Sequence, residues 1–142
     1  MARQEAVQEE IAERLLLAEL KEDLVRRADA FFTEDKKKPN DLGYKQIRNL
    51  VDLAAMSDCV LELKSFIRYQ IGRDNQGKSW RGSFHNGREF GLCLLDEIDA
   101  VVKLAESKGS KDKSFTLKVL AYYFGFLGWR VKYIEAQSPR GE

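Results

Sequence analysis

The chain has few of the residues that catalysis and metal binding use most. Its 142 residues include one histidine, His85, with two cysteines and two prolines. The zinc-binding motif HExxH, the serine-nucleophile motif GxSxG and clustered Asp/Cys ligands do not occur in it. One histidine with no evident nucleophile beside it gives little basis for acid-base catalysis. We therefore expect a protein that is not an enzyme and that holds no metal or other cofactor.

An excess of charge of one sign is also lacking. The chain has 24 basic and 23 acidic residues, a formal net charge of +1. A balanced chain has no overall field that attracts polyanions, so any nucleic-acid site must be a local patch. The two cysteines, Cys59 and Cys93, lie in apolar helical patterns without CxxC spacing. This favours buried free thiols over a disulfide or a pair of metal ligands.

Long uncharged apolar runs are absent as well. The first residues, "MARQEAVQEEIAERLLLAEL", carry charges throughout and contain no uninterrupted apolar segment of the kind that a signal peptide has. No other stretch reaches the length of a membrane span without a charge. The sequence thus predicts no membrane anchor and a cytoplasmic protein.

Helical periodicity is what the sequence does contain. Hydrophobic residues make up 44% of the chain, enough for the core of one domain. They recur at helical intervals over about 5–32, 41–71, 87–107 and 114–137. These patterns predict an all-α fold, a single-domain bundle of four or five helices with no sheet over residues 1–142. The end of the chain, from about residue 137, is expected to be a disordered tail.

Loop residues separate these helical stretches. Pro39 follows three lysines in "TEDKKKPND" and cannot continue a helix, and Gly109 suits a helix C-terminus. Asp41 is the predicted N-cap of the second stretch. Ser57 and Asp58 favour helix ends over helix interiors, so the second stretch is either one helix or two.

The last stretch, "SFTLKVLAYYFGFLGWRVKYIEAQ", is apolar on nearly every side. Such a helix usually lies at the centre of its bundle. The alternative is that one side covers a neighbouring subunit in a homo-oligomer, because a small bundle can hide few large rings. The candidate interface residues are Tyr122, Tyr123, Phe126, Trp129 and Tyr133.

One short stretch fits the pattern of a phosphate-binding loop. "GRDNQGKS", from Gly72 to Ser79, matches GxxxxGK[ST]. Such a loop needs a buried strand before it and a helix that begins at its Lys-Ser pair. Here the preceding residues have helical periodicity, and the following "WRGSFHNG" contains two glycines. We therefore interpret the match as accidental. A nucleotide hydrolase stays a hypothesis only because of this match.

A local excess of positive charge lies in the middle of the chain. Residues 64 to 88 contain six basic residues and one acidic residue, a local net charge of +5. Basic side chains can neutralise a nucleic-acid backbone, while exposed rings between them stack on bases. The candidate RNA contacts are Lys45, Arg48, Lys64, Arg68, Arg73, Lys78, Arg81 and Arg88 at phosphates, and Trp80 at a base. The alternative is a solvated loop whose rings dock on the bundle.

Two short segments also resemble a known family. "GYKQIRNLVDLA" (43–54) and "SFIRYQIGRD" (65–74), followed by Trp80, are similar to the small all-helical subunit of type III CRISPR RNA-guided effector complexes. The resemblance covers roughly residues 41–105. The first helix and the last segment lie outside it.

This resemblance implies a non-catalytic subunit of an antiviral ribonucleoprotein complex. Such a subunit is present in several copies beside other subunits and holds the path of guide and target RNA. The matching positions are Lys45, Arg48, Arg68 and Arg73. The alternative function is a helical adaptor that binds proteins through the aromatic last segment and binds no nucleic acid.

Overall fold

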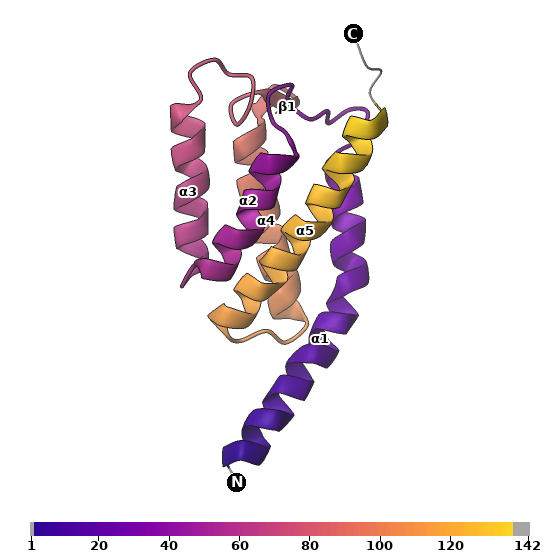
Figure 1. The fold of residues 1–142 in the computed structure, drawn as a ribbon, viewed down its shortest axis with the longest axis vertical. Helices are drawn as coiled ribbons and strands as arrows, with labels where there is room; N and C mark the ends of the chain where they lie inside the picture. Colours follow the sequence, from indigo (N-terminus) through magenta and orange to yellow (C-terminus); the bar gives the residue numbers. More distant parts are fainter. Residues whose placement is uncertain (1, 138–142) are drawn as a thin grey trace.

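A computed structural model describes residues 2–137 of the chain. The protein is a single-domain bundle of five helices, which confirms the all-α prediction (Figure 1). The elements are α1 (Ala2–Phe31), α2 (Tyr44–Met56), α3 (Val60–Arg73), β1 (Ser83–His85), β2 (Arg88–Glu89), α4 (Phe90–Ser107) and α5 (Lys113–Gln137). Of the predicted disordered tail, Gln137 belongs to α5, and residues 138–142 lie outside the described residues.

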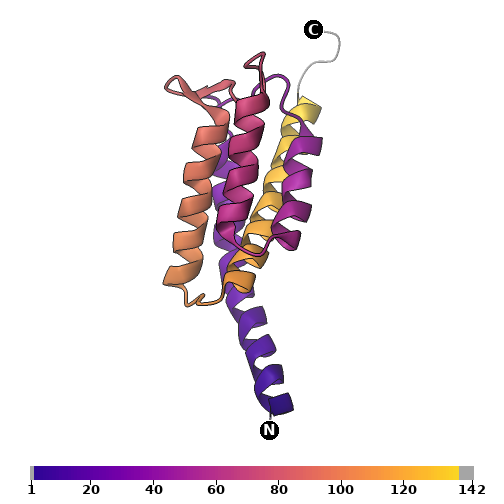
Figure 2. The ribbon, with the colours of Figure 1, turned by 90° about the vertical axis from the view of Figure 1, so that its left-hand side faces the viewer.

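Helix α5 is the centre of the bundle. It packs against α1, α2 and α4, and its buried residues include Leu120, Tyr123, Phe124 and Leu127. Helices α4, α3 and α2 stand side by side, and α5 lies between them and α1 (Figure 2). The apolar character of α5 on nearly every side therefore follows mainly from burial within one chain.

Helix α1 belongs to the bundle over only part of its length. Its buried residues, Leu17, Leu20, Leu24, Ala28 and Phe31, are spaced three or four apart and face the other helices. No residue described before Leu17 is buried, and these first turns project beyond the bundle (Figures 1 and 2). The projecting part, residues 2–15, is called the N-terminal arm below, and Leu16 already packs against the core.

The second predicted stretch forms two helices, α2 and α3. Ser57 ends α2, where its N–H and its hydroxyl both donate to the carbonyl of Leu53, at 2.9 and 2.7 Å. The prediction that Asp41 caps α2 is wrong. The helix begins after Gly43, whose N–H donates to the Gln46 side chain at 2.9 Å. Asp41 instead donates its N–H to the carbonyl of Lys78 at 3.0 Å, which ties two loops together.

A short hairpin of β1 and β2 was not predicted. Asn86 and Gly87 both have positive φ, 51° and 78°, as the tight turn between two antiparallel strands requires. The hairpin buries Phe84, whose ring lies 5.0 Å from that of Phe31 and 5.3 Å from that of Phe90. It thus closes the core where α1 ends and α4 begins.

Two other predictions concern membrane spans and the state of the two cysteines. Among residues 2–137, no helix is long and apolar enough to cross a membrane. Cys59 and Cys93 are free and half-buried, so they are less buried than the sequence predicts.

Candidate functional site: basic hollows and an aromatic groove

The predicted stacking residue Trp80 lies in the core. It is 5% exposed, and its ring centroid lies 5.8 Å from that of Phe90. Its carbonyl accepts the N–H of Gly91 at 2.8 Å. The prediction that Trp80 stacks on a base is therefore wrong, since burying this large ring stabilises the fold more than exposing it would.

The glycine-rich loop that follows α3 is organised by Asp74. Its carboxylate accepts the N–H groups of Gly77 and Ser79, both at 3.1 Å, and of Arg81 at 2.9 Å. Partial burial acts to raise the pKa of Asp74, but hydrogen bonds from the loop N–H groups outweigh it and hold the pKa below its ordinary value. Three of the loop's N–H groups are therefore already bonded to a carboxylate. Because Gly72 also lies inside a helix, the GxxxxGKS match lacks the setting of a phosphate loop.

Four predicted RNA contacts are ion-paired within the chain. Arg48 lies 3.4 Å from Asp52, Lys64 2.7 Å from Asp99, Arg81 3.3 Å from Glu89, and Arg88 3.1 Å from Asp96. The +5 charge along the sequence is thus largely compensated in space, chiefly by carboxylates of α4 and the hairpin. These pairs weaken the case for the four residues as phosphate contacts.

The other four predicted contacts are exposed. Within residues 2–137, no carboxylate lies within 4.0 Å of the charged groups of Lys45, Arg68, Arg73 or Lys78. Arg73 stacks over the ring of Tyr69, 5.6 Å from its centroid. Arg68 lies four residues after Lys64, so the two share one face of α3, and Lys64 points toward α4. Arg73 lies five residues after Arg68 and is therefore on a different face of the helix. The predicted site is therefore divided between faces of the molecule.

Segments from α2 and α3 meet at a polar hollow of about 320 Å³. Helix α2 contributes Gln46 and Asn49, and α3 contributes Phe66, Gln70 and Arg73. The loop after α3 completes the wall with Asp74, Ser79 and Trp80. The two segments that carry the family resemblance thus face one another in space.

A second concentration of basic side chains was missed from the sequence. A hollow of about 700 Å³ is lined by Lys36, Lys37, Lys38 and Arg130, with Glu34 as its acidic residue. A second hollow, of about 260 Å³, shares Lys37 and Lys38 and adds Lys78. We call Lys36, Lys37, Lys38, Lys78 and Arg130 the lysine surface. The run of three lysines was a visible signal, but the partners that fold against it come from distant segments.

Arg130 is unusual within this surface. Its Nε is buried without a hydrogen-bond partner among the described residues, while another guanidinium nitrogen donates to the carbonyl of Phe32 at 3.3 Å. The guanidinium also lies over the ring of Tyr133, 5.6 Å from its centroid. Because this Nε has almost no accessible surface, an acceptor in the hollow would reach it only after the Arg130 side chain moves.

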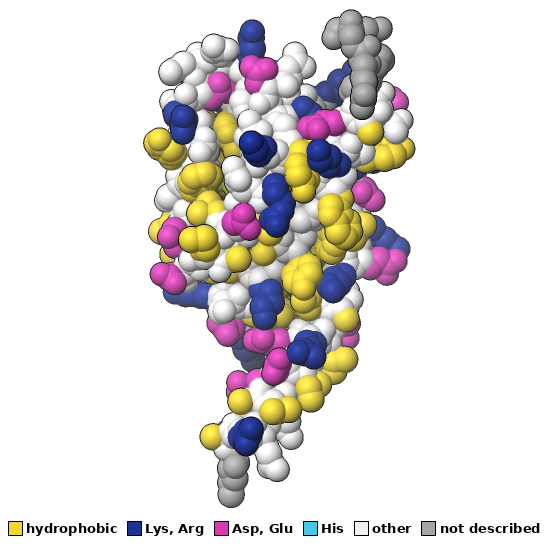
Figure 3. All heavy atoms as spheres, viewed as in Figure 1, with side chains coloured by type: hydrophobic (Ala, Val, Ile, Leu, Met, Phe, Trp, Pro, Cys, Tyr) yellow, Lys and Arg dark blue, Asp and Glu magenta, His cyan; other side chains and the backbone are white. Residues whose placement is uncertain are grey.

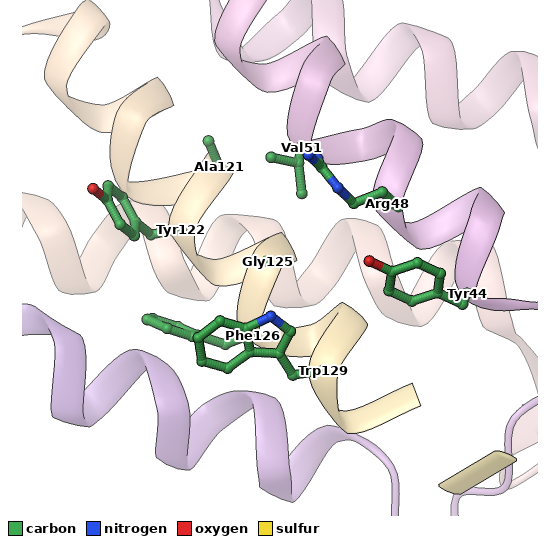
Figure 4. Close-up of a pocket in the computed structure, with 8 residues that line it drawn as sticks. All are labelled: Tyr44, Arg48, Val51, Ala121, Tyr122, Gly125, Phe126 and Trp129. Carbon is green, nitrogen blue, oxygen red and sulfur yellow. The ribbon is translucent and has the colours of Figure 1, made fainter. Parts of the chain in front are cut away.

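A second candidate site is an apolar groove of about 330 Å³ between α2 and α5, called the α2/α5 groove (Figure 4). Val51 and Ala121 point toward one another across it, and Phe126 and Trp129 lie together on α5. Its lining residues are Tyr44, Arg48, Val51, Ala121, Tyr122, Gly125, Phe126 and Trp129.

The five predicted interface residues divide between core and surface. Tyr123 is fully buried, and its hydroxyl donates to Glu97 at 2.8 Å, so its assignment to an interface is wrong. Phe126 is half-buried. Tyr122, Trp129 and Tyr133 are exposed by 40%, 69% and 58%. Burial in the core therefore accounts for Tyr123, while a subunit interface at the exposed rings of the last segment stays a prediction.

Comparisons with family models, with curated proteins and with solved structures find no match to this chain. Among residues 2–137, no group of three or more His, Cys, Asp or Glu side chains is placed to hold a metal ion. His85 is exposed on the hairpin beside Asn86. The functional argument therefore depends on the geometry of the hollows and the groove.

Proposed function

We propose that the chain is a non-catalytic RNA-binding structural subunit of a type III CRISPR effector complex, which contacts the RNA backbone through the lysine surface. The sequence resemblance of residues 43–54 and 65–74 suggests the class of complex. That these two segments line one hollow supports treating them as one unit. Guide and target RNA and the other subunits of such a complex are the partners that this proposal implies.

The lysine surface is the observation that carries the proposal. Five basic residues line two adjoining hollows in which Glu34 is the acidic lining residue. RNA phosphates are the ligands that such a concentration of positive charge attracts, with release of bound counterions. The exposed ring of Tyr133 in the same wall offers a surface for a base.

The predicted contacts outside this surface have unequal roles. Lys45 and Arg73 can extend the backbone path along α2 and α3. Four predicted contacts can bind a phosphate only in competition with the carboxylate that each pairs with, namely Arg48, Lys64, Arg81 and Arg88. Such surface ion pairs contribute only about 0–1 kcal/mol each to stability. We therefore assign the main phosphate contacts to the lysine surface.

The test is the affinity for single-stranded RNA as a function of salt. Wild-type affinity should fall steeply with salt, with a log-log slope of about −0.7 for each phosphate contacted. The Lys37→Ala/Lys78→Ala variant should bind all RNAs more weakly and with a flatter slope, because phosphate contacts carry no sequence information. Lys108→Ala/Lys111→Ala, which removes two exposed lysines between α4 and α5, is the matched control and should bind as wild type does.

Two results would overturn this proposal. One is the absence of RNA binding even at low salt, and the other is equal binding by wild type and the Lys37/Lys78 variant. The α2/α5 groove favours the alternative function, a helical adaptor that binds proteins and no nucleic acid. Either result would make that adaptor the better account.

A further inference from the structure

The α2/α5 groove has an open floor that the single chain does not need. Gly125 lies within α5, yet among the described residues no atom outside the adjacent turns of the helix comes within 4 Å of the position that a Cβ would occupy there. A glycine inside a helix is destabilising compared with alanine, and here no contact within the chain accounts for it. Gly128 differs, since a Cβ there would lie 3.3 Å from the ring of Tyr44. Gly125 thus leaves room for something that approaches the helix backbone.

The walls of the groove are apolar and partly exposed. Trp129 is 69% exposed and contacts Phe126 edge-on, with 5.4 Å between ring centroids. Val51 and Ala121 complete the apolar lining beside Gly125. A contiguous exposed apolar surface of this kind usually marks an interaction site, and its occupant should be apolar as well.

The N-terminal arm offers an apolar surface of matching form. Val7, Ile11 and Leu15 are 50%, 52% and 64% exposed and recur every four residues, so they share one face of α1. This face differs from the one that packs in the core, which begins at Leu17. Figure 3 shows hydrophobic side chains along the projecting part of α1. Anchors at this spacing are those with which an amphipathic helix binds in a groove.

Charge also matches between the arm and the groove. The arm contains two basic residues, Arg3 and Arg14, and four glutamates, a local net charge of −2. At the margin of the groove, exposed Lys45 lies on α2, and Lys132 lies over the ring of Tyr44, 4.7 Å from its centroid. Arg48 lines the wall but is paired with Asp52. The acidic arm is thus complementary to the basic margin of the groove.

The arm of the same chain does not fill this groove. Helix α1 is continuous from Ala2 to Phe31, and its arm points away from the bundle (Figures 1 and 2). We propose that the N-terminal arm of one copy binds in the α2/α5 groove of a second copy, through Val7, Ile11 and Leu15. Each bound copy still presents its own free arm or free groove, so the contact joins unlike surfaces and can add further copies head to tail. This inference does not depend on RNA binding.

Sedimentation of complementary variants tests the contact. The wild-type sedimentation coefficient should keep rising with concentration and should not stop at the value of a dimer. The arm variant Ile11→Glu/Leu15→Glu and the groove variant Gly125→Leu should each be monomeric alone. Mixed together, the intact groove of the first and the intact arm of the second should form a complex that stops at one to one.

Leu61→Glu is the matched control. Leu61 is 63% exposed on α3, close to the 64% of Leu15, so the substitution changes a similar surface elsewhere and should leave assembly unchanged. Trp129→Ala provides a second groove variant if Gly125→Leu does not fold, as judged by circular dichroism. It should lower the affinity between copies at least tenfold.

Several results would overturn the inference. One is a wild type that is monomeric at all concentrations, and another is an arm variant that assembles as wild type does. A mixture of the two variants that forms no complex would instead indicate contact between like surfaces. A groove variant that assembles normally but loses RNA binding would assign the groove to RNA.

Discussion

Arg27 of α1 and Glu97 of α4 form a bidentate pair, with hydrogen bonds of 2.7 and 3.3 Å. The hydroxyl of Tyr123 from α5 donates to the same carboxylate at 2.8 Å, so one side chain joins three helices. The hydrogen bond to Glu97 raises the pKa of Arg27, although burial opposes it. Burial and the neighbouring Glu97 raise the pKa of Tyr123 well above its ordinary value. Glu97 is therefore a structural residue that connects α1, α4 and α5.

Glu97→Ala should lower the free energy of unfolding by about 2–3 kcal/mol, because it leaves Arg27 and the Tyr123 hydroxyl without their partner. This loss is smaller than that expected for a fully buried ion pair, because the side chain of Arg27 is 39% exposed and water screens its charge. Urea denaturation measures it. Asp96→Ala, at an exposed carboxylate of the same helix, is the control and should cost less than about 1 kcal/mol. Equal losses in the two variants would contradict the role of Glu97.

Asp74→Asn should lower stability near neutral pH by about 1 kcal/mol, because it weakens the hydrogen bonds that the loop N–H groups make to the carboxylate. Despite the opposing effect of burial, hydrogen bonds from the loop N–H groups hold the pKa of Asp74 below its ordinary value in the folded protein. The stability that the Asp74 carboxylate contributes is therefore complete above the pKa of Asp74 in the unfolded chain. It is lost as pH falls through the lower pKa of the folded protein. The stability difference between wild type and Asp74→Asn should shrink as pH falls below about 4.

Denaturation measured across this pH range checks the prediction. Asp29→Asn removes an exposed carboxylate of α1 and is the control. A wild-type advantage over Asp74→Asn that stays constant down to pH 2 would show that the Asp74 carboxylate does not organise the loop.

Gly125→Ala should stabilise the monomer by about 0.5–1 kcal/mol, because its Cβ meets open space and alanine favours the helix. Gly128→Ala should gain less or lose stability, since its Cβ would press on Tyr44. Thermal unfolding at a concentration low enough to suppress self-association compares the two. The opposite order would mean that the floor of the α2/α5 groove is closed.

Trp80→Ala should lower the free energy of unfolding by about 3–5 kcal/mol, because it leaves a cavity in the core. Trp129→Ala should cost less than about 1 kcal/mol in the monomer, since its ring is 69% exposed. Chemical denaturation of the two variants gives the comparison. Similar losses would contradict the division of the two tryptophans between core and surface.

The order of the helices follows from the sequence alone. Apolar residues three and four apart predicted α1, α4 and α5 to within a few residues, because burial of one helix face requires that spacing. The break at Ser57 was a visible alternative for the same kind of reason, since Ser favours helix ends. The hairpin was missed although Asn86-Gly87 favours this turn, because only five strand residues surround it.

The site depended on tertiary packing. Periodicity shows that a helix has an apolar face, but it does not show which neighbour covers that face. The sequence therefore could not place Trp80 and Tyr123 in the core and leave Trp129 and the arm exposed. Charge along the chain was misleading for the same reason. Electrostatic interactions depend on distance in space, and folding brings Asp96 and Asp99 to Arg88 and Lys64 while it joins Lys37 to Lys78.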